Sequence, residues 1–342
     1  MRVLLTGHQG YLGTLMAPTL AAAGHQVVGL DSGLYADCVL GSLDQEDPPG
    51  IAVDLRDVTA GQLAGFDAVV HLAALSNDPL GALAPQHTYD INHHASTRLA
   101  TLAKEAGVSR FVYASTCSVY GASGTEDVLD EEAPMRPVTP YAESKVRVEG
   151  DLVDLADADF VPVSMRNATA FGFSPRLRAD IVLNNLVGHA LLSDVIYVMS
   201  DGTPWRPLVH GRDIAGAVVA ALAAPADVVR GQAFNVGSTE NNVQVRDIAD
   251  AVKEAVPHAE LRITGETGGD PRSYRVDFTR IGKVLPDFRA EWSVAAGAAE
   301  LIREYTARGL TKEGFDRRFT RLARLSDRTE AGTLDATLRP VR

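Results

Sequence analysis

Short apolar runs recur along the first half of the chain, separated by longer stretches with helical periodicity. The runs are rich in valine and lie at residues 2–6 (RVLLT), 26–30 (QVVGL), 67–72 (DAVVHL) and 110–115 (RFVYAS). Continuous apolar runs of this length are typical of strands that are buried on both faces. The stretches between them, such as 11–23 and 85–106, have the spacing of helices. This alternation predicts an α/β fold with a doubly wound parallel sheet.

The second half of the chain is less regular. Two further runs, 160–166 (FVPVSMR) and 233–237 (AFNVG), predict strands. The segments 170–209 and 238–290 contain more Gly, Pro and Arg and fewer long apolar runs. They predict a smaller C-terminal α/β region built over the carboxyl end of the sheet.

These patterns suggest a division into domains. We expect residues 1–168 to form the domain of the parallel sheet, with 206–237 returning to it. Residues 169–205 and 238–342 are expected to form the smaller region, which ends in a helical tail. Within the tail, residues 312–325 are basic and roughly amphipathic. A helix with a solvated basic face is expected there, with phosphate binding or a subunit contact as the alternatives.

Composition narrows the class of protein. The chain has 342 residues, of which 46% are hydrophobic, and a formal net charge of −12, which argues against a nucleic-acid-binding surface. No apolar run reaches the length of a membrane span, and MRVLLTG at the N-terminus lacks the pattern of a signal peptide. The two cysteines, Cys38 and Cys117, are too few for a disulfide framework or a cysteine-based metal site. We therefore expect a cytoplasmic protein without a membrane span or a metal.

Three glycines directly follow the first strand. The segment LLTGHQGYLG places Gly7, Gly10 and Gly13 where the strand ends and a helix begins. Glycines let the backbone approach a pyrophosphate, and the N-terminus of the helix offers N–H groups to it. The second strand ends at Asp31, whose carboxylate is suited to the ribose hydroxyls of adenosine and would repel a 2′-phosphate. The pattern predicts a Rossmann-type site for NAD rather than NADP.

Two later segments agree with a dinucleotide site. Asp54 and Leu55 follow the third strand in VDLRD (53–57), where we expect them to flank an adenine. The fourth strand ends in VVHLAAL (69–75), and Leu72, Ala73 and Ala74 are expected to let the cofactor pass closely. Each segment alone is unspecific, so the prediction depends on their order and spacing.

A tyrosine and a lysine share one face of a predicted helix. In TPYAESK, Pro140 suits the first helical turn and Thr139 can cap it, so Tyr141 and Lys145 at i and i+4 point the same way. The pKa of a free tyrosine, roughly 10, is too high for a base at neutral pH, and a nearby ammonium lowers it. The fifth strand ends near Thr116, whose hydroxyl can bond the substrate oxygen that Tyr141 deprotonates.

In this order, the motifs resemble the extended short-chain dehydrogenase/reductase family, and within it the NAD-dependent nucleotide-sugar epimerases and dehydratases. The resemblance is carried by GxxGxxG, Asp31, HLAA (71–74), STCSVYG (115–121) and YxxxK, and continues through RNATAFG (166–172), NNLV (184–187), WRPLVHGRDIAGA (205–217), FNVG (234–237) and DPRSYRVDFTRI (270–281). It covers residues 1 to about 305. It implies a Rossmann-type domain with NAD, a C-terminal nucleotide-sugar region and a homodimer.

The resemblance also implies roles for residues at matching positions. Tyr141 matches the catalytic base and acid, Thr116 the hydroxyl that assists it, and Lys145 the lysine that holds the cofactor. Asn92 matches an asparagine that supports the active site, with helix-end capping as the alternative. Arg206 matches an arginine on the diphosphate of the sugar nucleotide, with a salt bridge as the alternative. The expected cofactor-binding set is Gly7, Gly10, Tyr11, Leu12, Gly13, Asp31, Asp54, Leu55, Leu72, Ala73, Ala74, Asn92, Tyr141 and Lys145, and the expected substrate-binding set is Ser76, Thr116, Cys117, Ser118, Thr169, Asn185, Arg206 and Arg272.

Some positions depart from the family pattern. Thr169 stands where related epimerases have an asparagine, and GETGGD lacks an arginine that Arg272 or Arg275 is expected to replace. The 4,6-dehydratases of the family have STDEVYG, in which an Asp-Glu pair removes water. Cys117 and Ser118 occupy those positions here, so dehydration is disfavoured.

Cys117 itself has two interpretations. Some family members that epimerise at C3 or C5 use a cysteine in this loop to move a carbon-bound proton. Alignment on VYG puts that position at Ser118, one residue later, and such an offset in extended chain turns the side chain elsewhere. We therefore expect Cys117 to be a packing residue, with catalysis as the alternative.

The sequence as a whole predicts epimerisation of a nucleotide-diphosphate sugar through a transient 4-keto intermediate, with tightly bound NAD. One alternative is a nucleotide-sugar 4-ketoreductase or dehydrogenase that uses the same site and exchanges its cofactor. Another is a non-catalytic dinucleotide-binding scaffold, against which the tyrosine–lysine pair argues. The base, the sugar and the inverted carbon stay open.

Overall fold

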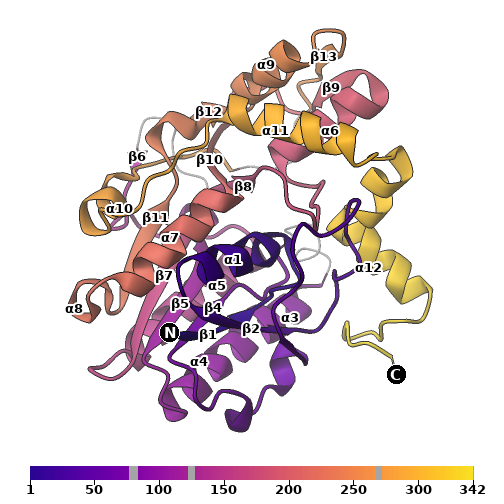
Figure 1. The fold of residues 1–342 in the computed structure, drawn as a ribbon. Helices are drawn as coiled ribbons and strands as arrows, with labels where there is room; N and C mark the ends of the chain where they lie inside the picture. The colour runs from indigo at the N-terminus through magenta and orange to yellow at the C-terminus, as the bar shows by residue number, and fades with distance from the viewer. Residues whose placement is uncertain (77–83, 122–127, 267–271, 342) are drawn as a thin grey trace.

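A parallel sheet of seven strands forms the centre of the computed structural model, which describes residues 1–76, 84–121, 128–266 and 272–341 (Figure 1). In spatial order its strands are β11 (Gln232–Val236), β7 (Val161–Asn167), β5 (Arg110–Thr116), β4 (Ala68–His71), β1 (Arg2–Thr6), β2 (Gln26–Asp31) and β3 (Gly50–Ala52). The order reverses between β1 and β4, which is where doubly wound sheets bind ligands. The predicted doubly wound fold is confirmed.

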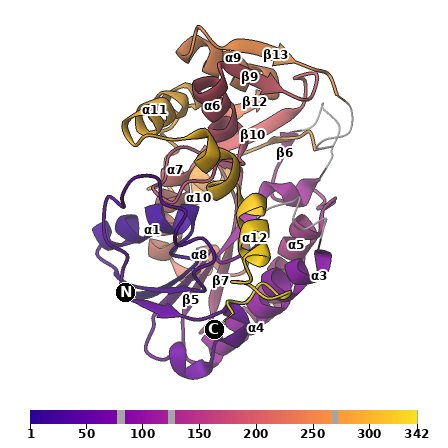
Figure 2. The same cartoon turned by 90° about the vertical axis from the view of Figure 1, so that its right-hand side faces the viewer.

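Helices cover both faces of this sheet (Figures 1 and 2). In β1, Val3 and Leu5 pack in the cluster that includes α1 (Tyr11–Ala22) and α7 (Gly211–Ala223). Leu4, which points the other way, packs with α4 (Ala95–Glu105) and α5 (Pro140–Leu155). Because successive strand residues face opposite sides and both sides are covered, the strands are continuous apolar runs.

The helical stretch expected at 85–106 contains a wider turn. It runs as α3 (Pro85–Thr88), a π-helical turn at Tyr89–His94, and then α4. Asn92 lies in the π-turn and is buried, and its amide exchanges two hydrogen bonds with the backbone of Leu75: Oδ1 accepts from N at 2.7 Å and Nδ2 donates to O at 3.0 Å. The turn therefore fixes the chain just beyond the end of β4.

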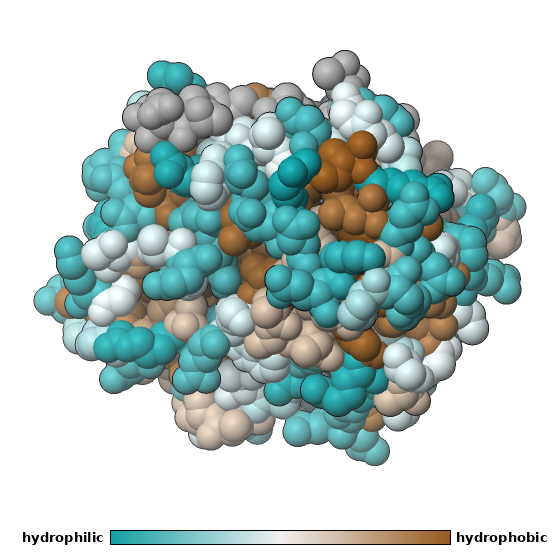
Figure 3. Space-filling view, turned by 90° about the horizontal axis from the view of Figure 1, so that it is seen from above, coloured by the Kyte–Doolittle hydropathy of each residue, from teal (hydrophilic) through white to brown (hydrophobic). Residues whose placement is uncertain are grey.

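A second region lies over the carboxyl ends of the sheet (Figures 1 and 2). Its strands are β8 (Thr169–Phe171), β10 (Trp205–His210) and β12 (Asn242–Gln244) in one sheet, β9 (Val195–Val198) with β13 (Glu260–Ile263), and β6 (Val128–Leu129) with β14 (Arg275–Val276). Its helices α6 (Val182–Ser193), α9 (Val245–Ala255) and α11 (Val294–Ala307) share one apolar core. Figure 3 shows that the face seen from above is largely hydrophilic, with smaller apolar patches.

The chain crosses between the two regions more than once. β10 pairs with β8 and β12, so the segment expected to return at 206–237 rejoins the central sheet only with α7, α8 (Ala226–Val229) and β11. α10 (Thr279–Val284) packs near β11 in the core of the central sheet. The division of the chain into domains stays a prediction.

The predicted helix at 312–325 is interrupted. A π-helical turn at Gly314–Arg318 is followed by a break at Phe319 and Thr320, and α12 then runs over Arg321–Glu330. Phe315 and Phe319, on either side of this change in geometry, both pack in the core of the second region. The C-terminal end then lies beside the central sheet (Figures 1 and 2).

A buried ion pair lies beneath the carboxyl ends of β5 and β7. Arg166 and Glu149 have side chains 6% exposed, and Arg166 donates to Glu149 through Nε at 3.0 Å and Nη2 at 2.8 Å. The Ser115 hydroxyl also donates to Glu149. Arg166 Nη1 lies 3.1 Å from the Tyr120 hydroxyl, which in turn donates to Asn235 at 2.7 Å. The network joins α5 to three neighbouring parts of the sheet.

Removing one member of this pair is expected to be costly. Arg166→Met leaves the Glu149 carboxylate buried without its cation, and we expect the free energy of unfolding to fall by about 3–5 kcal/mol. Urea denaturation followed by circular dichroism measures this. The control is Arg262→Met, because the ion pair of Arg262 with Glu260 is more than half exposed. Its loss is expected to lower the free energy of unfolding by less than about 1 kcal/mol. Equal costs for the two variants would contradict the role given to the buried pair.

Candidate active site

A cavity of about 970 Å³ lies at the carboxyl end of the central sheet, lined by residues of both regions. This volume is at the upper end of what small-molecule sites enclose. The predicted residues that line it are Gly7, Gly10, Tyr11, Leu12, Gly13, Asp31, Asp54, Leu55, Leu72, Ala73, Ala74, Ser76, Thr116, Ser118, Tyr141, Lys145, Thr169, Asn185, Arg206 and Arg272. The structure thus brings nearly the whole predicted set to one place.

The glycines at one end of the cavity are required by close backbone packing. Gly7 has φ +75°, and a Cβ there would lie 2.9 Å from the backbone nitrogen of Ala73. A Cβ on Gly13 would lie 2.1 Å from the Gly7 carbonyl oxygen. Among the described residues, no side chain caps α1 at Gly10. The uncapped N-terminus and the bare backbone form a cradle that fits a diphosphate group.

Two carboxylates lie beside this cradle. Asp31 accepts hydrogen bonds from the backbone N–H groups of Gln9 at 3.0 Å and Gly33 at 2.9 Å, which fix its orientation at the end of β2. Asp54 accepts a two-pronged contact from Arg56, through Nε at 2.8 Å and Nη2 at 2.7 Å. Burial alone would raise the pKa of Asp54, but Arg56 outweighs it and the pKa is lowered. These contacts fit the adenosine side of a dinucleotide.

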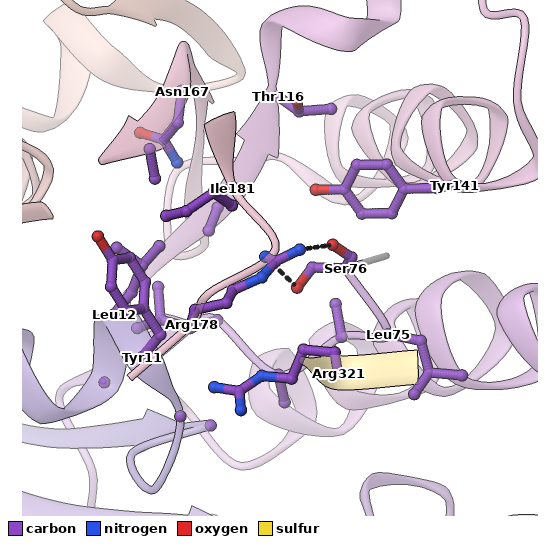
Figure 4. Close-up of a pocket in the computed structure, with 18 of the residues that line it drawn as sticks. Tyr11, Leu12, Leu75, Ser76, Thr116, Tyr141, Asn167, Arg178, Ile181 and Arg321 are labelled. Carbon is purple, nitrogen blue, oxygen red and sulfur yellow. Dashed lines mark hydrogen bonds between the residues drawn. The ribbon is translucent and has the colours of Figure 1, made fainter. Parts of the chain in front are cut away.

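The proposed catalytic residues face the cavity from β5 and α5. Figure 4 shows the Tyr141 hydroxyl pointing into the cavity, with Thr116 on the same side. Thr139 caps α5 by accepting from the Ala142 N–H at 3.2 Å, and Pro140 occupies the first turn. Thr116 accepts a hydrogen bond from the Ser118 N–H at 3.1 Å, which orients its hydroxyl. Local capping therefore positions both hydroxyl groups.

Lys145 is almost completely buried beneath these hydroxyls. Its Nζ donates to the Ala114 carbonyl at 2.6 Å and lies 5.7 Å from the centre of the Tyr141 ring. Burial lowers the pKa of Lys145 to about 7, and the opposing charge of Glu149 offsets this only in part. Burial and the Lys145 charge also lower the pKa of His71 to about 3, so its ring is a neutral partner of Thr6 and Ser96.

Cys117 and Asn92 are the two predicted residues that do not line the cavity. The Cys117 side chain is fully buried in the core, and its Sγ lies 3.1 Å from the Arg166 carbonyl oxygen. Burial raises the pKa of the Cys117 thiol well above its usual range. Its expected place among the substrate-binding residues is therefore wrong, because the turn after β5 directs Ser118 and not Cys117 to the cavity. Asn92 hydrogen-bonds the backbone of Leu75, which lines the cavity, but does not line it itself.

Two arginines lie at the end of the cavity toward the second region. Arg272 Nη1 lies 3.1 Å from the Ser118 hydroxyl, and Arg206 Nη1 donates to the backbone carbonyls of Trp205 and Arg272. Asn185 donates to the Ala179 carbonyl at 3.2 Å, which holds its amide at the edge of the cavity. The segment 267–271, which includes Asp270 of the GETGGD motif, lies outside the described residues.

Several lining residues were not predicted from the sequence. They are, among others, Tyr35, Asn167, Arg178, Tyr274 and Arg321. Arg178 donates to Ser76 at two atoms, 3.0 Å to Oγ and 2.7 Å to the carbonyl, and its Nε pairs with Asp180 at 2.9 Å (Figure 4). The only signals in the sequence were the arginine content of 170–209 and the basic tail. Neither specifies which side chain reaches the cavity.

The site and fold together define a dinucleotide-dependent enzyme with a tyrosine–lysine pair at the end of a Rossmann-type sheet. Comparison with known proteins gives the family. Residues 3–237 match the model of the NAD dependent epimerase/dehydratase family. The chain is 31% identical over 313 residues to the UDP-glucose 4-epimerase of Mycolicibacterium smegmatis, which covers 88% of this chain and 97% of that relative. It is 29% identical over 267 residues to the UDP-glucose 4-epimerase of Neisseria meningitidis serogroup B, which covers 69% of this chain and 77% of that relative.

Solved structures agree with this assignment. MoeE5 in complex with UDP-glucose and NAD matches with a TM-score of 0.78 at 27% identity, over 91% of this chain and 100% of its own. The NAD-bound UDP-glucose 4-epimerase of Stenotrophomonas maltophila matches with a TM-score of 0.78 at 25% identity, over 90% of this chain and 99% of its own. The chain therefore belongs to the NAD dependent epimerase/dehydratase family and is an NAD-dependent enzyme, as predicted. Among the described residues, no helix is long and apolar enough to cross a membrane.

The buried lysine predicts a pH dependence of stability. The pKa of Lys145 is about 7 in the folded protein, whereas an unfolded lysine keeps its proton to roughly pH 10. Between these values the unfolded state binds more protons, so this group makes stability rise with pH, by at most about 1.4 kcal/mol per unit. Urea denaturation of cofactor-free protein at several pH values gives the free energy of unfolding, which is compared between wild type and Lys145→Met. The wild-type curve should rise relative to the variant from pH 7 to 10, and parallel curves would contradict the depressed pKa.

Proposed function

We propose that the protein epimerises a nucleotide-diphosphate sugar at C4, with a UDP-hexose as the first substrate to test. The observation that carries the proposal is the convergence of Thr116, Tyr141 and Lys145 on a cavity that has a diphosphate cradle at one end and arginines at the other. Support comes from the relative of 31% identity, which is named a UDP-glucose 4-epimerase and is matched over 97% of its length.

Each catalytic side chain has a defined task in this proposal. Bound NAD supplies reversible hydride transfer. Tyr141 removes the proton of the C4 hydroxyl and later returns it, while the Thr116 hydroxyl holds the same oxygen. Lys145, fixed by the Ala114 carbonyl, favours the phenolate of Tyr141 and is placed to hold the nicotinamide ribose. Inversion requires that the 4-keto sugar present its other face before the hydride returns.

The arginine end supports a nucleotide-diphosphate sugar. Arg206 and Arg272 lie where a diphosphate would extend from the sugar, and planar guanidinium groups suit two-pronged contacts to such oxygens. The Ser118 hydroxyl, held by Arg272, lies next to Thr116 and is placed to contact the sugar ring. The homodimer and the cytoplasmic location remain predictions.

Elimination of water is the less favoured reaction. Removing water across two ring carbons needs an acid and a base besides Tyr141. In the part of the chain that the structure describes, the carboxylates lining the cavity are Asp31, Asp54 and Asp180. Asp31 and Asp54 lie at the adenosine end, and Asp180 pairs with Arg178. None of them adjoins Thr116 in the way that an Asp-Glu pair at positions 117 and 118 would.

The reaction type can be distinguished with UDP-glucose. We expect purified protein without added cofactor to convert it into a mixture with its C4 epimer, measured by NMR and chromatography. No 4-keto-6-deoxy sugar should accumulate, and added NADH should not be consumed. Stoichiometric consumption of NADH would favour the reductase instead.

Tyr141→Phe tests the catalytic assignment. Loss of the proton-transferring hydroxyl should lower kcat by roughly 100-fold or more. Thr116→Val, which keeps the shape but not the hydroxyl, should lower it by roughly 10-fold. The matched control is Tyr89→Phe, because the Tyr89 hydroxyl bonds Glu143 on the outside of α5 and does not line the cavity. Undiminished turnover in Tyr141→Phe would rule out the assignment.

A further inference from the structure

The C-terminal tail, defined here as residues 319–341, packs against the outside of the cofactor end of the cavity. Three leucines of the tail, Leu325, Leu334 and Leu338, form a buried apolar cluster with Leu75 and Ile91. Leu34 and Tyr35 pack against the same cluster. Because Leu34, Tyr35, Leu75 and Ile91 all line the cavity, the tail supports the cavity wall from behind.

Polar contacts fasten the tail to the same wall. Arg56, which grips Asp54, also donates from Nη1 to the Thr337 carbonyl at 2.8 Å. Arg328 of α12 donates to the Leu34 carbonyl at 2.8 Å. Arg324 and Arg339 form ion pairs with Asp37 and Asp57. The tail is thus connected to the loops that follow β2 and β3, which carry the adenosine side of the site.

One tail side chain passes through this wall into the cavity. Arg321, the first residue of α12, is only 4% exposed and lines the cavity. Its guanidinium lies 4.2 Å over the Tyr35 ring, and its buried Nη1 has no hydrogen-bond partner among the residues that the structure describes. Figure 4 shows the side chain extending from α12 below Arg178 and Ser76. A buried cation without an acceptor is unfavourable, so the position indicates an anionic ligand.

The surroundings indicate which anion this is. Arg321 packs over Tyr35, a few residues beyond Asp31, whereas Arg272 contacts Ser118 after β5. Asp31 is already engaged by backbone N–H groups, and Arg178 by Asp180. The anion expected at this end is the diphosphate received by the uncapped N-terminus of α1 at Gly10.

We propose that Arg321 holds the diphosphate of bound NAD from the side opposite the glycine cradle. The C-terminal tail then serves as a strap that retains the cofactor, because the group that contacts the diphosphate is anchored to both adenosine-side loops. The inference depends on NAD binding and not on the identity of the sugar, so it can fail while the proposed function stands.

The test is the affinity for NAD of the full-length protein carrying Arg321→Met. Methionine keeps an apolar stem over Tyr35 but removes the charge. We expect the Kd for NAD, measured by titration calorimetry on protein stripped of cofactor, to rise roughly 10- to 100-fold. The amount of NAD that co-purifies with the protein should fall in parallel. Arg321→Lys keeps the charge but not the planar guanidinium, so its Kd for NAD should lie between those of wild type and Arg321→Met.

The control is Arg317→Met, the same substitution at an exposed arginine of the preceding turn that pairs with Asp327. It should leave the Kd for NAD unchanged. UDP, titrated into NAD-loaded protein, should bind the Arg321 variants as it binds wild type. Unchanged NAD affinity in a folded Arg321→Met protein would overturn the proposal, and so would a loss of UDP affinity instead. If Arg321→Met does not fold, Arg321→Lys decides between the same outcomes.

Discussion

The close approach of backbone at the first β–α turn is the constraint on which the site depends. A side chain at Gly13 would collide with the Gly7 carbonyl, and one at Gly7 would collide with the backbone of Ala73. These contacts bring the end of β1, the start of α1 and the end of β4 together without intervening side chains. The N-terminus of α1 therefore opens directly into the cavity, and the reversal of strand order beside β1 leaves room for a ligand there.

Charge is distributed along the cavity in a way that fits an anionic cofactor and an anionic substrate. Lys145 lies buried at the middle, where its ammonium is held near Tyr141 at the cost of a depressed pKa. Arg206 and Arg272 lie toward the second region, and Arg321 enters from the C-terminal tail. The net charge of −12 thus coexists with a site whose cations are placed by long-range folding.

The strands and the cofactor-binding end of the cavity were predictable because they depend on residues that follow one another closely in the sequence. Buried parallel strands are continuous apolar runs, and the glycine turn, Asp31 and the tyrosine–lysine pair lie at fixed places relative to them. The direction of the Cys117 side chain was harder to predict, because a short turn after β5 decides whether residue 117 or 118 reaches the cavity. The tail could not be placed at all. Arg321 reaches the site through a break at Phe319 and Thr320, and the apolar cluster that holds α12 includes residues more than two hundred positions earlier.

In the proposed reaction, the hydride leaves C4 of the sugar and returns to the same carbon within one closed site. UDP-glucose carrying deuterium at C4, converted by the enzyme in ordinary water, tests this most directly. We expect NMR to find the deuterium retained at C4 in both epimers. Loss of the label to solvent, or its transfer to added NAD, would contradict it.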